Sequence, residues 1–115
     1  MKIEKLEDII IWQESRKFVS DIYGTFRNCR DFAFRDQIQR ATISVMNNIA
    51  EGFERRGDKE FKRFLVIAKG SCGEVRSMLY AALDLKYINE NDFDKLFEKA
   101  DCISRKTASL ISKLN

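Results

Sequence analysis

Five cationic side chains fall within nine residues of the stretch ERRGDKEFKR. They are Arg55, Arg56, Lys59, Lys62 and Arg63. Cations spaced this closely can contact several phosphates of a nucleic acid and release the counterions condensed on it. Three carboxylates, those of Glu54, Asp58 and Glu60, lie among them and neutralise part of the charge. The stretch therefore fits a nucleic-acid-binding site and an ordinary solvated turn equally well.

The residue types that most enzymes need are scarce. The chain has no histidine, which removes Ser-His and Cys-His nucleophile pairs and nearly every transition-metal site. Its three widely spaced cysteines, Cys29, Cys72 and Cys102, are expected to be reduced thiols. GSCGEV around Cys72 is similar to the surroundings of a cysteine-protease nucleophile, but without histidine we expect a small buried residue. We therefore expect a protein that is not an enzyme and that needs no metal, cofactor or small-molecule substrate.

Polar side chains recur at spacings of three and four between residues 37 and 51, which places them on one narrow stripe of a helix. They are Gln37, Arg40, Ser44, Asn48 and Glu51. Ser71 and Glu74 offer partners on the next segment, where Gly70 and Gly73 would let another backbone come close. We expect a structural network in which Arg40 pairs with Glu51 or Glu74. A ligand pocket is the weaker alternative, because one arginine with one or two acids lacks the perturbed pair that catalysis needs.

Four helices are predicted to position these residues. Proline is absent and only five glycines are present, so helices should dominate. The apolar periodicity predicts helices over residues 10–27, 31–56 and 58–86, and a fourth from residue 90 onward. Asp8 and Asn89 are possible N-caps, and Gly57 could take the left-handed conformation at a helix end. Residues 1–115 should therefore form one domain, an all-α, antiparallel up-and-down four-helix bundle.

Four large apolar residues stand together near the start of the chain: Ile9, Ile10, Ile11 and Trp12. Consecutive side chains point around a helix or alternate across an extended segment, so they cannot all face one core. We expect some of them to contact a neighbouring subunit. The alternative is that this N-terminal segment folds back over its own bundle.

Charge and hydropathy indicate in which cellular compartment we expect the protein. The formal net charge is +3, no apolar run approaches the roughly 20 residues of a membrane span, and the first residues lack the pattern of a secretory signal. The sequence predicts a cytoplasmic protein that does not enter the membrane.

The stretch DQIQRATISVMNNIAEGFERRGDKEFKRFLVIAKGSCGEV, with IIIWQES and SDIYGTF before it, resembles a family of small bacterial four-helix-bundle proteins. These are the 23S rRNA-intervening-sequence proteins, similar in fold to the accessory protein of diversity-generating retroelements. The resemblance covers residues 6–88. It implies a ring-like homopentamer that binds nucleic acid, no catalytic residues, and an architectural role for the polar stripe with Ser71 and Glu74. Met46 stands where a proline often interrupts the second helix of the family, which favours a straighter helix here, and Arg27 stands where the family often has proline after Phe26, which leaves the form of the loop before that helix open.

Two hypotheses from different classes remain. The first is a non-enzymatic, oligomeric nucleic-acid-binding protein, RNA-directed, that presents the basic stretch on every subunit. The second is a structural adaptor that binds a protein partner through an exposed bundle face. Strong weakening of binding by salt favours the first hypothesis, and salt-tolerant binding to one protein favours the second.

Overall fold

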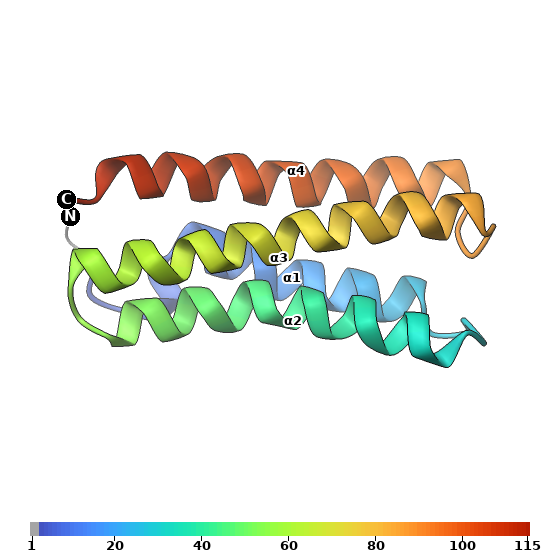
Figure 1. The fold of residues 1–115 in the computed structure, drawn as a ribbon, viewed down its shortest axis with the longest axis horizontal. Coiled ribbons are helices and arrows are strands. Elements are labelled where there is room, and N and C mark those ends of the chain that lie inside the picture. The colour runs from blue at the N-terminus through green and yellow to red at the C-terminus, as the bar shows by residue number, and fades with distance from the viewer. Residues whose placement is uncertain (1–2) are drawn as a thin grey trace.

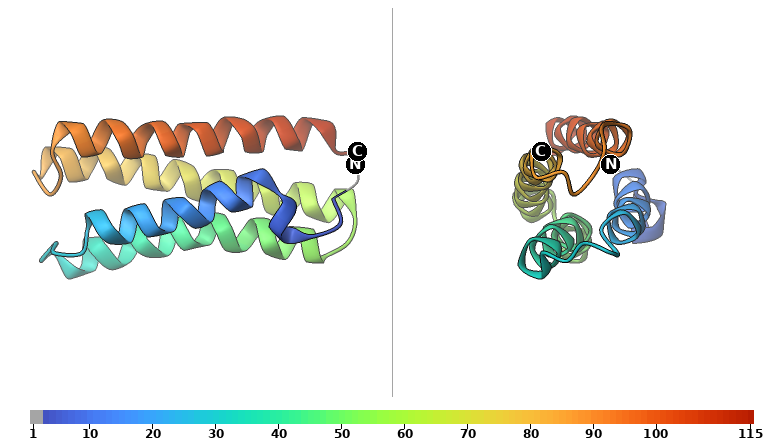
Figure 2. Two further views of the ribbon diagram at one scale, coloured as in Figure 1. Left: turned by 180° about the vertical axis from the view of Figure 1, so that it is seen from behind. Right: turned by 90° about the vertical axis from the view of Figure 1, so that its right-hand side faces the viewer.

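Four long helices form an antiparallel bundle in the computed structural model, which describes residues 3–115 (Figure 1). A short 3₁₀ helix, η1 (Leu6–Asp8), precedes α1 (Ile10–Thr25), α2 (Phe32–Glu54), α3 (Asp58–Asp84) and α4 (Glu90–Lys113). Each helix packs against the next one in the chain, and α1 packs against α4 to close the bundle (Figure 2). The bundle measures 43 × 21 × 19 Å. The predicted fold class and the four helices are confirmed.

The core follows the predicted periodicity most closely on α3 and α4. On α3, Phe61, Phe64, Leu65, Ala68, Cys72, Val75, Leu79 and Ala82 are all buried, and on α4 so are Leu96, Ala100, Ile103 and Thr107. On α1 the inner face follows Ile11, Phe18 and Ile22, while Tyr23 is 39% exposed.

Side-chain caps fix the starts of α2 and α4. Asp31 accepts a hydrogen bond from the Phe34 backbone N at 3.1 Å, and Asn89 accepts one from the Asp92 N at 2.7 Å. Tyr87 also donates its hydroxyl to Asp31 at 2.6 Å, and this bond lowers the pKa of the Asp31 carboxyl. The Asn89 prediction is confirmed. Asp8 is not a cap, because it lies within η1 and α1 begins after Ile9 without a side-chain cap.

Gly52 lets α2 and α3 approach closely. A Cβ built on Gly52 would lie 2.7 Å from Cβ of Phe64 and 3.1 Å from Cδ1 of Phe61. Gly70 and Gly73, which we expected to provide this close approach, have nothing within 4 Å of a built Cβ. That expectation was wrong because both glycines lie on the side of α3 that faces away from α2 and from the core.

Candidate nucleic-acid interface

The basic stretch forms the tight turn between α2 and α3. α2 ends at Glu54, Arg55 caps it with helical dihedral angles, and Arg56 takes the left-handed conformation with φ 58°. Gly57 has φ 172°, which is extended backbone that any residue adopts. The prediction that Gly57 takes the left-handed position was therefore wrong by one residue, and the chain reverses direction at an arginine.

Two arginines of this turn are held in place. Their guanidinium carbons lie over the Phe64 ring, Arg55 at 5.1 Å and Arg63 at 4.6 Å from its centroid. Arg63 Nε lies 3.2 Å from Oε2 of Glu60, and Arg55 Nη1 lies 3.8 Å from Oε1 of the same carboxylate. The hydrogen bond from Arg63 is the main cause that lowers the pKa of Glu60. Because Glu51 also pairs with Arg55, at 3.3 Å, these two arginines are partly neutralised.

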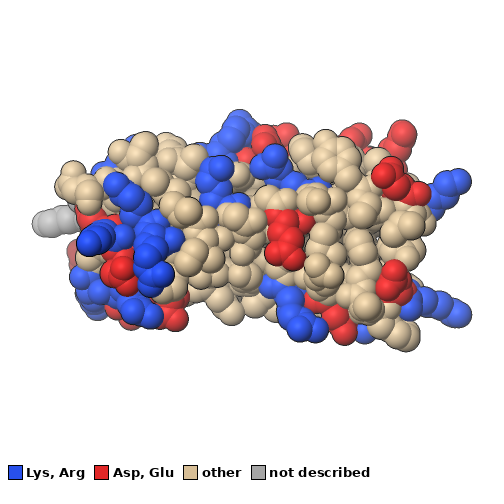
Figure 3. Space-filling model, viewed as in Figure 1, with Lys and Arg blue, Asp and Glu red and all other residues tan. Residues whose placement is uncertain are grey.

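The other three cations are free of such partners. Arg56 and Lys59 are exposed and Lys62 is half-buried, and within the described part of the chain none of the three forms an ion pair. Figure 3 shows basic side chains gathered at this end of the molecule, with acidic ones among them. The turn thus places three unpaired cations beside two that are anchored on Phe64. We call these five residues the basic turn.

The polar stripe divides into two parts. Ser44 and Ser71 share a hydrogen bond of 2.9 Å between their hydroxyls, and Asn48 Nδ2 donates to the Ser44 carbonyl at 2.8 Å and to its hydroxyl at 3.0 Å. The Ser44–Ser71 bond joins α2 to α3 as expected, whereas Asn48 bonds to Ser44 within α2. The structure therefore contains the serine–asparagine half of the proposed network.

The charged half of the stripe faces outward. Gln37, Arg40 and Glu74 are exposed and line a shallow groove of about 500 Å³. Glu51 pairs with Arg55, and no ion pair joins Arg40 to Glu51 or Glu74 among residues 3–115. The expected buried Arg40 pair was wrong, because residues at the margin of this bundle remain in contact with water and need no counter-charge.

The four apolar residues near the start of the chain mostly serve their own bundle. Ile9 and Ile11 are each 3% exposed and belong to the core cluster, whereas Ile10 is 55% exposed. Trp12 is half-buried and lies under Arg16, whose guanidinium carbon is 5.9 Å from the ring centroid. Ile9 has extended dihedral angles between η1 and α1. The side chains of Ile9 and Ile11 can therefore both point into the core. Of the expected contact residues, Ile10 has the most exposed side chain.

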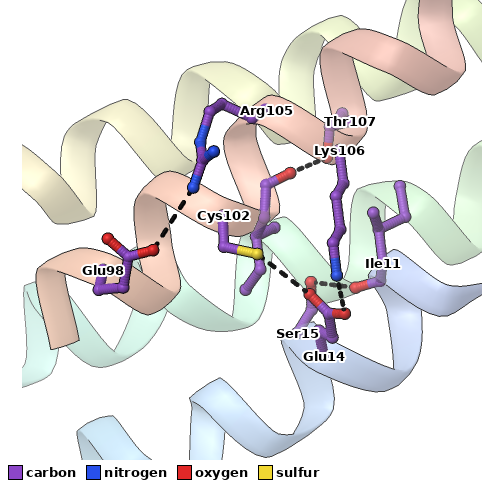
Figure 4. A network of polar contacts seen from close by, with 9 residues as sticks. Ile11, Glu14, Ser15, Glu98, Cys102, Arg105, Lys106 and Thr107 are labelled. Atoms are coloured by element: carbon purple, nitrogen blue, oxygen red, sulfur yellow. Dashed lines mark hydrogen bonds and ion pairs between the residues drawn. The ribbon is translucent and has the colours of Figure 1, made fainter. Parts of the chain in front are cut away.

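A second hollow, which the sequence did not indicate, lies between α1 and α4. It measures about 520 Å³, has Phe18 and Ile103 in its lining, and is crossed by two ion pairs, Lys106–Glu14 at 2.5 Å and Lys99–Asp21 at 2.6 Å. Figure 4 shows Lys106 and Cys102 of α4 directed toward Glu14 of α1. The bond to Glu14 raises the pKa of Lys106. Lys99 and Lys106 are paired, whereas Lys17, which also lines this groove, is exposed and forms no ion pair within residues 3–115.

Beyond these surfaces, the described residues contain few groups that could bind a metal ion or take part in a reaction. All three cysteines are free, and the buried Cys72 donates its thiol to the Ala100 carbonyl at 3.0 Å. No group of three or more metal-ligating side chains occurs in residues 3–115. Over the same residues no helix is both long and apolar enough to pass through a bilayer.

Comparisons with known proteins agree with this architecture. Residues 7–109 match the family model described as 23S rRNA-intervening sequence protein, so the match extends into α4. A crystal structure of a protein with unknown function from the S23 ribosomal protein family of Bacteroides thetaiotaomicron superposes with a TM-score of 0.83 at 22% identity, over 89% of this chain and 98% of that chain. The search of curated proteins found no significant match. Because the family model covers most of its length, the chain belongs to the 23S rRNA-intervening sequence protein family.

Proposed function

We propose that this protein binds nucleic acid through the basic turn, with RNA as the first candidate, and that it catalyses no reaction. The observation that carries the proposal is a set of three cations that form no ion pair within residues 3–115, Arg56, Lys59 and Lys62, next to two arginines anchored on Phe64. Unpaired, solvated cations can neutralise phosphates without first breaking an internal ion pair. The membership in the 23S rRNA-intervening sequence protein family is consistent with this proposal.

Binding through the basic turn would depend on contacts to the phosphates of the nucleic acid. Contacts to the nucleic-acid backbone position a protein without reading bases, so binding should show little sequence preference. Glu54, Asp58 and Glu60 lower the affinity of a single turn. An assembly of several copies would repeat the basic turn and add the contributions of separate turns.

A salt titration tests the proposal. For single-stranded RNA, four phosphate contacts give a log–log slope of affinity against salt of roughly −3, about −0.7 per contact. The double variant Arg56→Ala/Lys59→Ala should weaken binding to all sequences alike and flatten the slope by about one to one and a half units. The control is Arg27→Ala/Lys95→Ala, which removes the same charge from exposed positions between α1 and α2 and near the start of α4.

Two results would count against this function. If the wild type does not bind RNA or DNA at low salt, the proposal fails. If the two double variants lose affinity equally, only the net charge of the protein attracts nucleic acid and the basic turn is not the site.

A second candidate function is a structural adaptor that binds another protein. It is favoured by the apolar side chains that α3 exposes, Val66 at 55% and Ile67 at 42%. Binding that survives added salt and is lost in Val66→Ser, while Arg56→Ala/Lys59→Ala keeps it, would favour the adaptor over the nucleic-acid-binding protein.

A further inference from the structure

The groove between α1 and α4 is built from one repeated pattern of side chains. Residues of both helices line it at spacings of three, one and three: Glu14, Lys17, Phe18 and Asp21 on α1, and Lys99, Cys102, Ile103 and Lys106 on α4. This spacing keeps each set on one face of its helix. Because the two helices are antiparallel (Figure 1), the ends of one set lie opposite the ends of the other, and the central residues of the two sets face each other.

Two ion pairs bound the groove at its ends. Lys106 of α4 pairs with Glu14 of α1 at 2.5 Å, and Lys99 of α4 pairs with Asp21 of α1 at 2.6 Å. From one pair to the other, each helix advances by about 10 Å, since an α-helix rises 1.5 Å per residue. Both carboxylates therefore already have a cation, and the space between the two pairs remains open.

The floor between the two ion pairs is apolar. Phe18 and Ile103 form it, and both belong to the buried core. The alkyl stems of the flanking lysines can extend this apolar surface toward the solvent. The hollow of about 520 Å³ remains because α1 and α4 pack more loosely than the other neighbouring helices. Its volume lies within the range of roughly 300–1,000 Å³ that is typical of small-molecule sites.

The lining carries one positive charge more than it neutralises. Its charged side chains are those of Lys17, Lys99 and Lys106 against those of Glu14 and Asp21. Lys17 is exposed and has no ion-pair partner in the described part of the chain. Glu14 and Asp21 lie within one helical turn of Lys17, but each is held by a lysine of α4. The middle of the groove therefore presents a free ammonium group above an apolar floor.

We infer that the groove between α1 and α4 binds a small amphipathic monoanion, a free medium-chain carboxylate such as octanoate. Its alkyl chain lies on Phe18 and Ile103 between the two ion pairs, and its carboxylate accepts a hydrogen bond from the Lys17 ammonium group. A monoanion matches the single spare positive charge, whereas a dianion would leave excess negative charge beside Glu14 and Asp21. The sequence predicted no small-molecule substrate, because this groove forms only when two helices far apart in the chain pack together. The inference does not depend on nucleic-acid binding.

Calorimetric titration with octanoate tests the site. The wild type should bind with a dissociation constant below about 1 mM. Lys17→Ala should raise that constant about two- to fivefold, as expected for the loss of one exposed charge pair. Cys102→Leu places a larger side chain in the groove and should raise it at least about tenfold. The control is Lys95→Ala, which removes an exposed lysine of α4 outside the groove and should bind as the wild type does. Circular dichroism checks that each variant is folded.

Thiol alkylation of the wild type locates the bound ligand. Cys102 lines the groove, whereas Cys29 is also a free, half-buried cysteine but lies outside it. Octanoate at ten times its dissociation constant should slow the reaction of Cys102 with iodoacetamide about tenfold, because about nine tenths of the sites are then occupied. The reaction of Cys29 should not change. This measurement needs no variant, so it tests the site even if Cys102→Leu fails to fold.

Three results would overturn the inference. One is the absence of octanoate binding at about 1 mM. Another is equal protection of Cys102 and Cys29, or binding that a folded Cys102→Leu leaves intact, since the ligand would then lie elsewhere. The third is octylammonium binding as tightly as octanoate, because a cation of the same length should be repelled by Lys17.

Discussion

Glycines with the same helical conformation have different surroundings in this bundle. Gly52 lies where α2 and α3 touch, and even a methyl group there would meet the Cβ atom of Phe64. Gly24, Gly70 and Gly73 have open space around them. The residue type alone does not distinguish these cases, because the difference lies in what the neighbouring helix places beside each glycine.

We predict that Gly52→Ala lowers the free energy of unfolding by about 1–3 kcal/mol, since the added methyl group forces α2 away from the Cβ atom of Phe64 and from the ring and carbonyl of Phe61. Urea denaturation followed by circular dichroism measures this change. Gly24→Ala is the control and should be neutral or stabilising by up to about 1 kcal/mol. Equal stability of the two variants would show that the helices can separate here without cost.

The Cys72 thiol should make the stability of the bundle depend on pH in the alkaline range. Burial raises the pKa of its thiol from 9.0 to about 11. Between these values the unfolded chain releases the proton and the folded chain keeps it, so stability should fall as the pH rises from about 9 toward 11. The difference between the wild type and Cys72→Ala, measured by urea denaturation at several pH values, isolates this contribution from other titrating groups. A difference that stays constant from pH 8 to about pH 11 would contradict it.

At the level of the helices, local sequence signals predicted the elements well and the turns less well. The inner positions of α3 and α4 repeat at regular spacing, so their burial could be read directly. The turn at Arg56 could not, because Gly57 is the usual left-handed residue and the sequence does not show that α2 ends at Glu54, two residues before the predicted end. The start of α1 at residue 10 was predicted, but η1 before it was missed, since η1 depends on how Leu6 and Ile9 pack against the rest of the bundle.

The sequence and the structure both identify Asn89 as the N-cap of α4. Asn89→Ala should cost about 1 kcal/mol of unfolding free energy, because the Asp92 N–H loses its acceptor. Asn89→Asp keeps an acceptor at the same place and should remain within about 0.5 kcal/mol of the wild type. Thermal melts of both variants decide between a cap and an ordinary surface position.

At the level of the whole molecule, the sequence predicted which residues form the candidate site. It did not predict how their side chains are arranged. The five cations of the basic turn are close in sequence, so their proximity in space was expected. That Arg55 and Arg63 share Phe64 and Glu60 while the other three stay unpaired depends on side-chain packing between two helices. The outward direction of Arg40 and Glu74 depends on the angle between α2 and α3, which the periodicity does not specify.

An even number of helices returns the chain to the end where it started, and this makes the bundle suitable for circular permutation. Ile3 and Leu114 line one small hollow together with Arg56 and Gly57, and the Asn115 backbone N donates to Asp58 at 3.2 Å. A short glycine–serine linker could therefore join the two ends, and new ends could be opened at the exposed Lys86 between α3 and α4. The permuted protein should keep the helical circular dichroism spectrum of the wild type. Its ends would then lie near the opposite end of a bundle 43 Å long, so a tag or dye could be attached without crowding the basic turn.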